Sequence, residues 1–273
     1  MEEIVDTHAH LSERKDDGLI PYAQKNGLRY TIDELLENMR GHHIRRGLLL
    51  SPPLKRGSPL PNTDVLRLCA RSEKMLAPVV TVEPSIKEAK AALKLAEENW
   101  KDVKAFKIRL GYVKASAASK VFDSVYDFAE SKRLPVMFHT GDTATSNGDL
   151  TSSHPLTLDR LANKRDELRI VLCHFGNPWF EDTAELIYKH SNVYADTSGL
   201  ITGGAYREKH AEWVARKISE AVYFASGAEK IFFGTDYPVS KHSESLDLIR
   251  RLEIDEEDKA RILSRNAIRV YNL

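Results

Sequence analysis

Near its N-terminus the chain reads Ile4-Val5-Asp6-Thr7-His8-Ala9-His10. Ile4 and Val5 are residue types that favour a buried strand. Because side chains two residues apart on a strand point to the same face, both imidazoles should project together from the strand end, close enough to share a cation. Histidines also fall two apart by chance, so the pair predicts a metal site only if further ligands follow other strands.

Composition excludes several classes of protein. The 273 residues include 40 basic and 40 acidic side chains, so the formal net charge is zero and we expect neither nucleic acid nor an anionic membrane as a partner. No apolar run approaches the roughly 20 residues that span a bilayer, and we expect no signal peptide. Cys69 and Cys173 fall in apolar patterns and are expected as buried free thiols, which suits the cytoplasm and excludes a cysteine-based zinc site.

Apolar segments alternate with segments of helical period along the whole chain. The apolar segments are rich in Val, Ile, Leu and Phe, as in parallel strands covered on both faces. They comprise residues 4–8, 46–51, 75–82, 103–110, 134–140, 169–175, 192–197 and 231–235. The segments between them show apolar stripes, of which one is formed by Ile32, Leu35, Leu36 and Met39. Residues that commonly cap helices precede three of them, namely Thr31, Ser85 and Ser243.

Eight strands, each followed by a helix, match the size and rhythm of a (β/α)8 TIM barrel of the α/β class. The alternative is an open doubly wound sheet, which usually has fewer strands and often a glycine-rich phosphate-binding turn after the first strand. In this chain the first strand ends in histidines instead. No composition break, linker or repeat interrupts the pattern, so we predict one domain over residues 1–273.

Long connections are expected on one face of this barrel. Residues 11–30, 141–153 and 198–209 follow the first, fifth and seventh predicted strands, whereas the connections from helix to strand are short. Barrel enzymes build their substrate pockets at the C-terminal ends of the strands. The two histidines of the first strand should lie on that face.

Three further apolar runs end in a polar side chain on the same predicted face. The fifth ends in His139, the sixth in His174 and the eighth in Asp236. Singly, each histidine could be a satisfied core residue and the aspartate a helix cap. Burying such groups without partners costs several kcal/mol, and one metal ion would satisfy all of them. A set of nitrogen and oxygen ligands suits Zn²⁺, with Mn²⁺ or Fe²⁺ as alternatives.

The other histidines fall in predicted helices or loops, and we expect most of them on the surface. His154 and His210 lie in or beside long connections, so they are candidates for contact with a substrate. The rest are His42, His43, His190 and His242.

Taken together, these motifs resemble the amidohydrolase superfamily. The likeness is closest to its amidohydrolase-related branch, which includes aminocarboxymuconate semialdehyde decarboxylase. It is carried, in order along essentially the whole chain, by VDTHAH (5–10), VMFHTGD (136–142), IVLCHFG (170–176), NVYADTSG (192–199), FFGTDYP (232–238) and the closing ILSRNAIRVY (262–271).

The resemblance implies one divalent metal ion, usually zinc. Its expected ligands are His8, His10, His139 and Asp236, and His174 matches the sixth-strand histidine that acts on the substrate.

Other superfamily members hold two metals bridged by a carboxylated lysine on the fourth strand, and Lys107 is the candidate for that lysine. The related branch usually lacks the second metal, so Lys107 could instead pair with a buried carboxylate. Arg109 is the better candidate for gripping a substrate carboxylate, because its guanidinium fork suits that group. Lys107 and His154 are further candidates for substrate contact.

The resemblance leaves three functions open. The first is hydrolysis of a C–N or C–O bond in a small, acidic amide, cyclic amide or lactone, in which Asp236 handles the proton of an activated water and His174 polarises the carbonyl. The second is non-oxidative decarboxylation of an aromatic or unsaturated acid by the same residues. The third is a catalytically inactive metal-binding barrel that serves as a binding or scaffold protein. We expect a small-molecule substrate, a cytoplasmic location and, by default, a homodimer.

Overall fold

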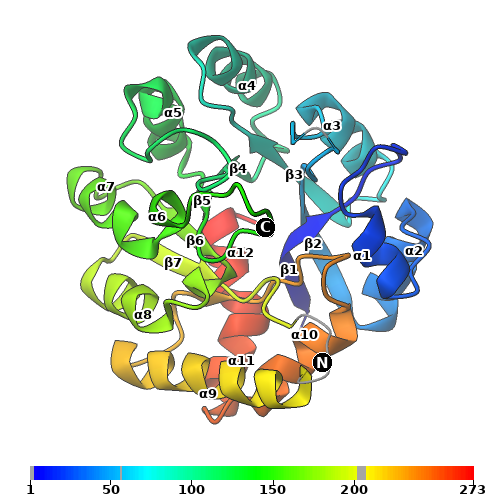
Figure 1. Ribbon diagram of the computed structural model, residues 1–273, viewed down its shortest axis with the longest axis vertical. Coiled ribbons are helices and arrows are strands. Elements are labelled where there is room, and N and C mark those ends of the chain that lie inside the picture. Colours follow the sequence, from blue (N-terminus) through cyan, green and yellow to red (C-terminus); the bar gives the residue numbers. More distant parts are fainter. Residues whose placement is uncertain (1–2, 56, 202–206) are drawn as a thin grey trace.

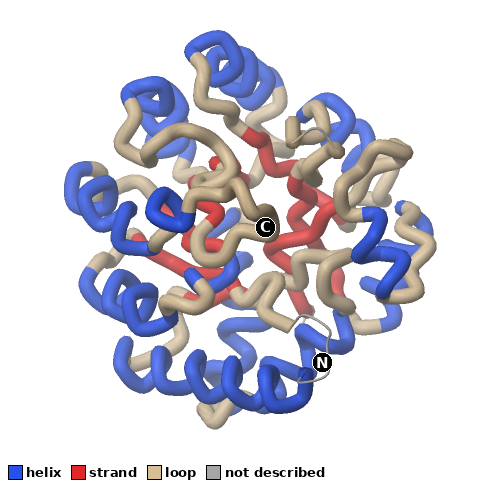
Figure 2. The backbone as a smooth tube through the Cα atoms, in the orientation of Figure 1, coloured by secondary structure: helices blue, strands red, loops and turns tan. Residues whose placement is uncertain are grey.

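The computed structural model describes residues 3–55, 57–201 and 207–273. Eight parallel strands form one sheet in sequence order, and helices surround it on the outside (Figures 1 and 2). The strands are β1 (Ile4–His10), β2 (Ile44–Leu50), β3 (Leu76–Thr81), β4 (Ala105–Ile108), β5 (Val136–His139), β6 (Ile170–Cys173), β7 (Val193–Asp196) and β8 (Ile231–Phe232). The helices are α1 (Ile20–Lys25), α2 (Ile32–Gly41), α3 (Asn62–Ala70), α4 (Ile86–Glu98), α5 (Asp123–Lys132), α6 (Leu150–Ser153), α7 (Asp159–Lys164), α8 (Phe180–Lys189), α9 (Arg207–Ala225), α10 (His242–Arg251), α11 (Glu256–Ala260) and α12 (Asn266–Tyr271).

The sheet closes between its last and first strands. The closing hydrogen bonds lie beyond the end of β8: the Thr7 N–H donates to the Phe233 carbonyl (2.9 Å), and the Asp236 N–H donates to the His8 carbonyl (2.7 Å). The His10 N–H then donates to the carbonyl of Tyr237 (2.7 Å). The chain is therefore a single-domain TIM barrel, as the sequence predicts.

Apolar side chains form two separate layers. The larger layer packs between the strands and the surrounding helices, and it includes the buried α2 stripe predicted from the sequence. The smaller layer fills the barrel interior and includes Val79 of β3 and Met137 of β5. Helix α12 closes the N-terminal end of the barrel by adding Val270 and Tyr271 to this interior layer (Figure 1). The C-terminal end of the barrel interior is lined by polar side chains, among them those of His8, His10 and His139.

All eight strands occur where the sequence predicts them, but several end earlier. Strand β6 ends at Cys173 and β8 at Phe232, so the polar residues that follow are not part of the ladder. The backbone turns there into the left-handed region, with φ of 61° at His174 and 59° at Asp236. A residue in that conformation cannot continue a strand, and such backbone strain often accompanies functional sites.

Two of the three predicted helix caps are confirmed. The side-chain oxygens of Thr31 and Ser85 each accept the backbone N–H three residues further on, at 3.3 and 3.1 Å. The prediction for Ser243 is wrong, because α10 begins two residues earlier than that cap implies, at His242, with Lys241 as its N-cap.

Strand β1 contains an irregularity that decides which way its side chains point. Its pairing with β2 shifts register between Asp6 and Ala9. Strict alternation would place Val5 and Ala9 on one face, yet Val5 packs in the barrel interior and Ala9 in the outer layer. A bulge of this kind re-aims the residues after it, and here it turns His8 and His10 toward the interior.

The long connections lie at the open end, and α1 forms part of the first one. The connection predicted over 198–209 includes residues 202–206, which lie outside the described residues. Among the helices of the described ranges, none has both the length and the apolar character needed to cross a membrane.

Candidate metal centre

Two strand ends bring His8, His10 and Asp236 together at the open end of the barrel. Asp236 Oδ1 lies 3.1 Å from Nε2 of His10 and 3.5 Å from Nε2 of His8. His8 is 1% exposed and His10 9%, so the cluster is almost closed to solvent. These are three of the four ligands predicted from the sequence.

The opposite ring nitrogens show how the two imidazoles are oriented. Nδ1 of His8 lies 3.0 Å from Asp196 Oδ2, and Nδ1 of His10 lies 3.1 Å from the Leu50 carbonyl. Carboxylates and carbonyls only accept hydrogen bonds, so each Nδ1 carries the proton and a neutral ring keeps its lone pair on Nε2. Two lone pairs then face one anionic oxygen, which is unfavourable unless a cation lies between them. The donor set therefore fits a divalent metal ion.

Protonation supports the same conclusion. Burial, together with the nearby positive charge of Lys107, lowers the pKa of His8 to about 4, so its ring is neutral at pH 7. Burial alone would raise the pKa of Asp236, but the imidazole rings around its carboxylate, with His10 the largest contribution, outweigh it and hold that pKa below the usual range. A neutral imidazole and an ionised carboxylate are the forms that bind metals.

His139 and His174 lie beside this cluster. The His174 ring centroid is 5.0 Å from that of His8 and 4.8 Å from that of His139. Nε2 of His139, however, donates to the Asp142 carbonyl at 2.9 Å. Within the described residues, two groups of ligand atoms lie within 4.8 Å of one another, His8/His10/Asp236 and His8/His174/Asp196, and His139 belongs to neither. Its role as the fourth ligand stays a prediction.

Asp196, at the end of β7, connects the cluster to His174. Its carboxylate is fully buried and accepts hydrogen bonds from the His8 ring, from the His174 backbone N–H (2.9 Å), and from the Ser198 N–H (3.1 Å) and hydroxyl. The sequence interpretation quoted this residue in a motif but gave it no role. The signal was present, because Asp196 ends an apolar run just as His139 and Asp236 do.

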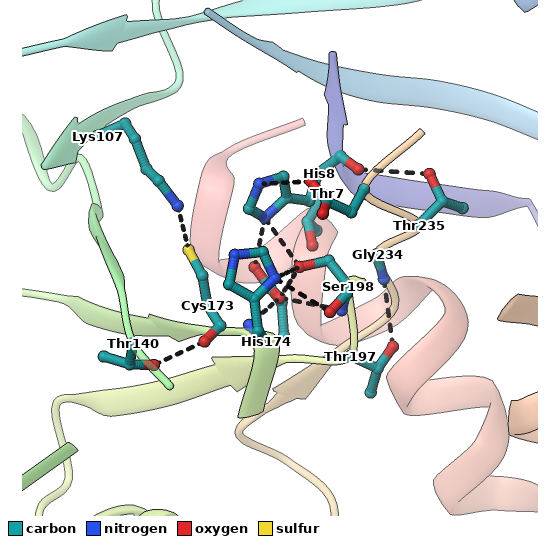
Figure 3. Close-up of polar contacts among 12 residues, drawn as sticks. Thr7, His8, Lys107, Thr140, Cys173, His174, Thr197, Ser198, Gly234 and Thr235 are labelled. Atoms are coloured by element: carbon teal, nitrogen blue, oxygen red, sulfur yellow. Dashed lines mark hydrogen bonds and ion pairs between the residues drawn. The ribbon is translucent and has the colours of Figure 1, made fainter. Parts of the chain in front are cut away.

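Ser198 lies between the His8 and His174 rings (Figure 3). Its Oγ is 3.0 Å from Nδ1 of each ring and also contacts Asp196. The group formed by His8, His174 and Asp196 is therefore joined by a hydroxyl, without need of a second metal ion.

Hydrogen bonding also fixes the tautomer of His174. Its Nδ1 lies 3.1 Å from the Ser198 carbonyl, which can only accept, so Nδ1 carries the proton. Burial lowers the pKa of His174, which favours the neutral ring with a free lone pair on Nε2. In this form His174 accepts a proton, and it can donate one to an oxygen only after it has been protonated.

Lys107 points from β4 toward Cys173 on β6 (Figure 3). Its Nζ donates to the Cys173 Sγ at 2.8 Å, and the lysine is 5% exposed. Its partner is thus a thiol, where the sequence interpretation proposed a carboxylate or a carboxylated side chain. Cys173 and Cys69 are both buried and free, as predicted.

The remaining substrate-contact candidates have other partners. Arg109 donates to Glu83 Oε1 (2.9 Å) and to the Gly57 carbonyl (3.1 Å). His154 lies 3.8 Å from the Asp182 carboxylate, and its ring packs against Trp179. His210 donates to the carbonyl of Leu200 at 3.0 Å. Substrate contact by these side chains stays a prediction.

Gly199 supports the cluster through its lack of a side chain. Its φ is +65°, and a Cβ there would lie 2.8 Å from Asp236 Oδ2 and 3.1 Å from His174 Nδ1. We expect Gly199→Ala to displace Asp236 and to lower turnover by up to about 10²-fold, as small misplacements of reacting groups do. Gly27→Ala is the matched control, because Gly27 has a φ of +68° with nothing within 4 Å of its Cβ position.

Both substitutions should cost about 1–2 kcal/mol in unfolding free energy from the left-handed backbone alone. Denaturant titration of both variants, with metal content and turnover measured in parallel, separates the two effects. Equal losses of turnover in the two variants would contradict the role given to Gly199.

Comparisons with known proteins were made for the whole chain. A family model described as Amidohydrolase matches residues 5–273. No curated protein matches the sequence. An uncharacterised TIM-barrel protein from Bordetella bronchiseptica superposes with a TM-score of 0.77 at 19% identity, covering 98% of each chain.

Two similar solved structures have described activities. A probable 2-pyrone-4,6-dicarboxylic acid hydrolase from Acinetobacter baumannii has a TM-score of 0.71 at 15% identity and covers 100% of each chain. A dihydroxybenzoic acid decarboxylase from a Polaromonas species, with bound manganese, has a TM-score of 0.69 at 16% identity and covers 100% of this chain and 98% of its own. At these identities the likeness shows the fold.

Proposed function

The chain belongs to the amidohydrolase family of metal-dependent enzymes, and from this we propose that it hydrolyses a C–N or C–O bond in a small, acidic substrate. One divalent ion would be held by His8, His10 and Asp236, with His139 as a candidate fourth ligand. The observation that carries the proposal is the convergence of two imidazole Nε2 atoms on one carboxylate oxygen, at 3.1 and 3.5 Å.

When bound, such an ion lowers the pKa of a coordinated water to about 7 and so supplies a nucleophile at neutral pH. We propose Zn²⁺ because two nitrogens and one carboxylate oxygen suit it, and Mn²⁺ as the alternative because a similar structure contains manganese.

Two side chains move the protons in this proposal. Asp236 is ionised and lies next to both imidazoles, so it accepts the proton of the attacking water and returns it to the leaving group. His174 has a free lone pair on Nε2, so it takes up a proton and then stabilises the negative charge that develops on the substrate oxygen. Ser198 and Asp196 hold His174 in this tautomer and orientation.

Arg109 is proposed to recognise the acidic group of the substrate. Arg109 is 9% exposed, and its Nε has no partner among the described residues. Glu83 already occupies part of its fork, so a substrate carboxylate would bind beside this pair or displace Glu83 from it.

Non-oxidative decarboxylation is the second candidate. It is favoured by the similar structures described as decarboxylases of dihydroxybenzoate and 5-carboxyvanillate. In that reaction His174 or Asp236 would first take up a proton from water or from a substrate hydroxyl and then deliver it to the substrate carbon as carbon dioxide leaves.

Isotope incorporation distinguishes the two reactions directly. Lactones, cyclic amides and hydroxylated aromatic acids would be offered to the metal-loaded enzyme in water enriched in the heavy oxygen isotope, and separately in deuterium oxide. Hydrolysis places the heavy oxygen in the product, whereas decarboxylation releases carbon dioxide and places deuterium on carbon. The second pattern alone would overturn the proposal of hydrolysis.

Metal removal tests the requirement for the ion. We expect a chelator to abolish turnover, added Zn²⁺ or Mn²⁺ to restore it, and elemental analysis to find one ion per chain, because the described cluster contains one converging set of free lone pairs. Two ions per chain would support a carboxylated Lys107 instead. Protein that binds no divalent metal would support the inactive barrel.

A further inference from the structure

Asp6 lies next to the metal cluster and accepts hydrogen bonds from both chain segments that provide its ligands, β1 and the segment after β8. Its side chain is 1% exposed. Oδ1 accepts the backbone N–H of His8 (3.0 Å) and that of Thr235 (3.0 Å), and Oδ2 accepts the Thr235 hydroxyl (2.6 Å). One carboxylate therefore binds a ligand residue on β1 and the residue just before Asp236.

The local backbone explains why such a link is needed. The ladder of β8 ends at Phe232, and Asp236 follows four residues later in the left-handed conformation. Regular pairing with β7 therefore does not extend to this ligand. On the other side, the bulge in β1 interrupts the pairing with β2 between Asp6 and Ala9. Both ligand segments leave their ladders with β2 and β7, and Asp6 joins them in addition to the backbone hydrogen bond from the Asp236 N–H to the His8 carbonyl.

We propose that Asp6 is a positioning residue that fixes His8 relative to Asp236 and thereby sets the affinity of the site for its metal ion. This inference rests on the proposed function, because it takes His8 and Asp236 as ligands.

The geometry predicts that asparagine, but not alanine, can replace Asp6. An asparagine oxygen at the Oδ1 position would still accept both backbone N–H groups. Its amide nitrogen would donate to the Thr235 hydroxyl, which can turn to the His8 carbonyl at 3.3 Å. The same nitrogen would face Nε2 of His242, which lies 3.6 Å from Oδ2, is buried and has no hydrogen-bond partner among the described residues. His242 is one of the histidines for which the sequence predicts a surface position, and its burial contradicts that prediction.

The test compares Asp6→Ala, Asp6→Asn and the control Asp17→Ala. Asp17 is another fully buried carboxylate near β1, but it binds Ser12, Tyr30 and the Leu19 N–H, away from the β1–β8 junction. Competition with a chromophoric chelator gives the Zn²⁺ dissociation constant of each protein. We expect Asp6→Ala to weaken Zn²⁺ binding by about 10–100-fold, as the loss of a group that orients ligands does. Asp6→Asn and Asp17→Ala should bind Zn²⁺ nearly as tightly as the wild type.

Hydrogen exchange keeps this test separate from that of the proposed function. In the metal-free proteins, peptides covering 4–10 and 233–238 should exchange faster in Asp6→Ala than in Asp6→Asn. A wild type that binds no Zn²⁺ would overturn the proposed function. The hydrogen exchange of the metal-free proteins would still show whether Asp6 joins the two segments. Wild-type affinity in Asp6→Ala, or an equal loss in Asp17→Ala, would overturn the inference. If Asp6→Ala does not fold, Thr235→Val against Thr235→Ser makes the same comparison.

Discussion

Replacing Asp236 with asparagine should lower kcat by about 10²–10⁴-fold, the range found when a general acid or base is lost. The amide has the shape of the carboxylate but cannot take the proton of the attacking water. It also removes the anionic oxygen that faces Nε2 of His8 and His10, so metal affinity should fall as well. Turnover would be measured at saturating Zn²⁺, with the bound metal determined on the same samples, so that loss of the ion and loss of the base are distinguished.

The fold of this variant should survive. Asp236 contributes its backbone N–H to the His8 carbonyl, and the substitution leaves that hydrogen bond in place. Asp17→Asn provides the control, since it neutralises a buried carboxylate that lies outside the cluster. Full activity in Asp236→Asn with metal bound would rule out the proton-transfer role given to this side chain.

Replacing Asp196 with alanine should destabilise the protein by about 3–5 kcal/mol, because three buried donors lose their acceptor at about 1–3 kcal/mol each. The fully buried carboxylate is the acceptor for the His8 ring and for the backbone N–H groups of His174 and Ser198. Alanine would leave these donors unsatisfied and would remove an anion close to Lys107.

Denaturant titration of the metal-free proteins measures this loss, and Asp16→Ala is the control because Asp16 pairs with Arg14 on the exposed surface. That control should change stability little. Asp196→Asn should lie between wild type and alanine, because an amide oxygen can still accept some of the hydrogen bonds. A loss no larger in Asp196→Ala than in Asp16→Ala would contradict the central place of Asp196.

The barrel and part of its site could be predicted from sequence because local signals determine them. Apolar runs locate every strand, and polar residues at the ends of such runs identify His8, His10, His174 and Asp236 as neighbours. A metal site could be predicted because such residues follow four different strands, which is more than chance placement of single histidines would give.

The rest depends on contacts that local patterns do not contain. The pairing of Lys107 with Cys173 depends on how β4 and β6 are staggered across the interior. The burial of His242 follows from its stacking on Tyr237, a contact between α10 and the segment after β8. Asp6 faces away from the cluster and has the appearance of an ordinary strand residue, although it binds both ligand segments.

The irregular pairing of β1 bears on how this strand can change in length. Val5 and Ala9 are four residues apart, so strict alternation would turn them to one face, and the bulge is what lets Val5 and the two histidines face the interior together. Removing Thr7 would make that spacing odd, and strict alternation would then give the observed directions without a bulge. Proteins that lack Thr7 and still fold should therefore keep both histidines directed inward. The bulge is thus required by the number of residues between Val5 and Ala9 more than by their identities.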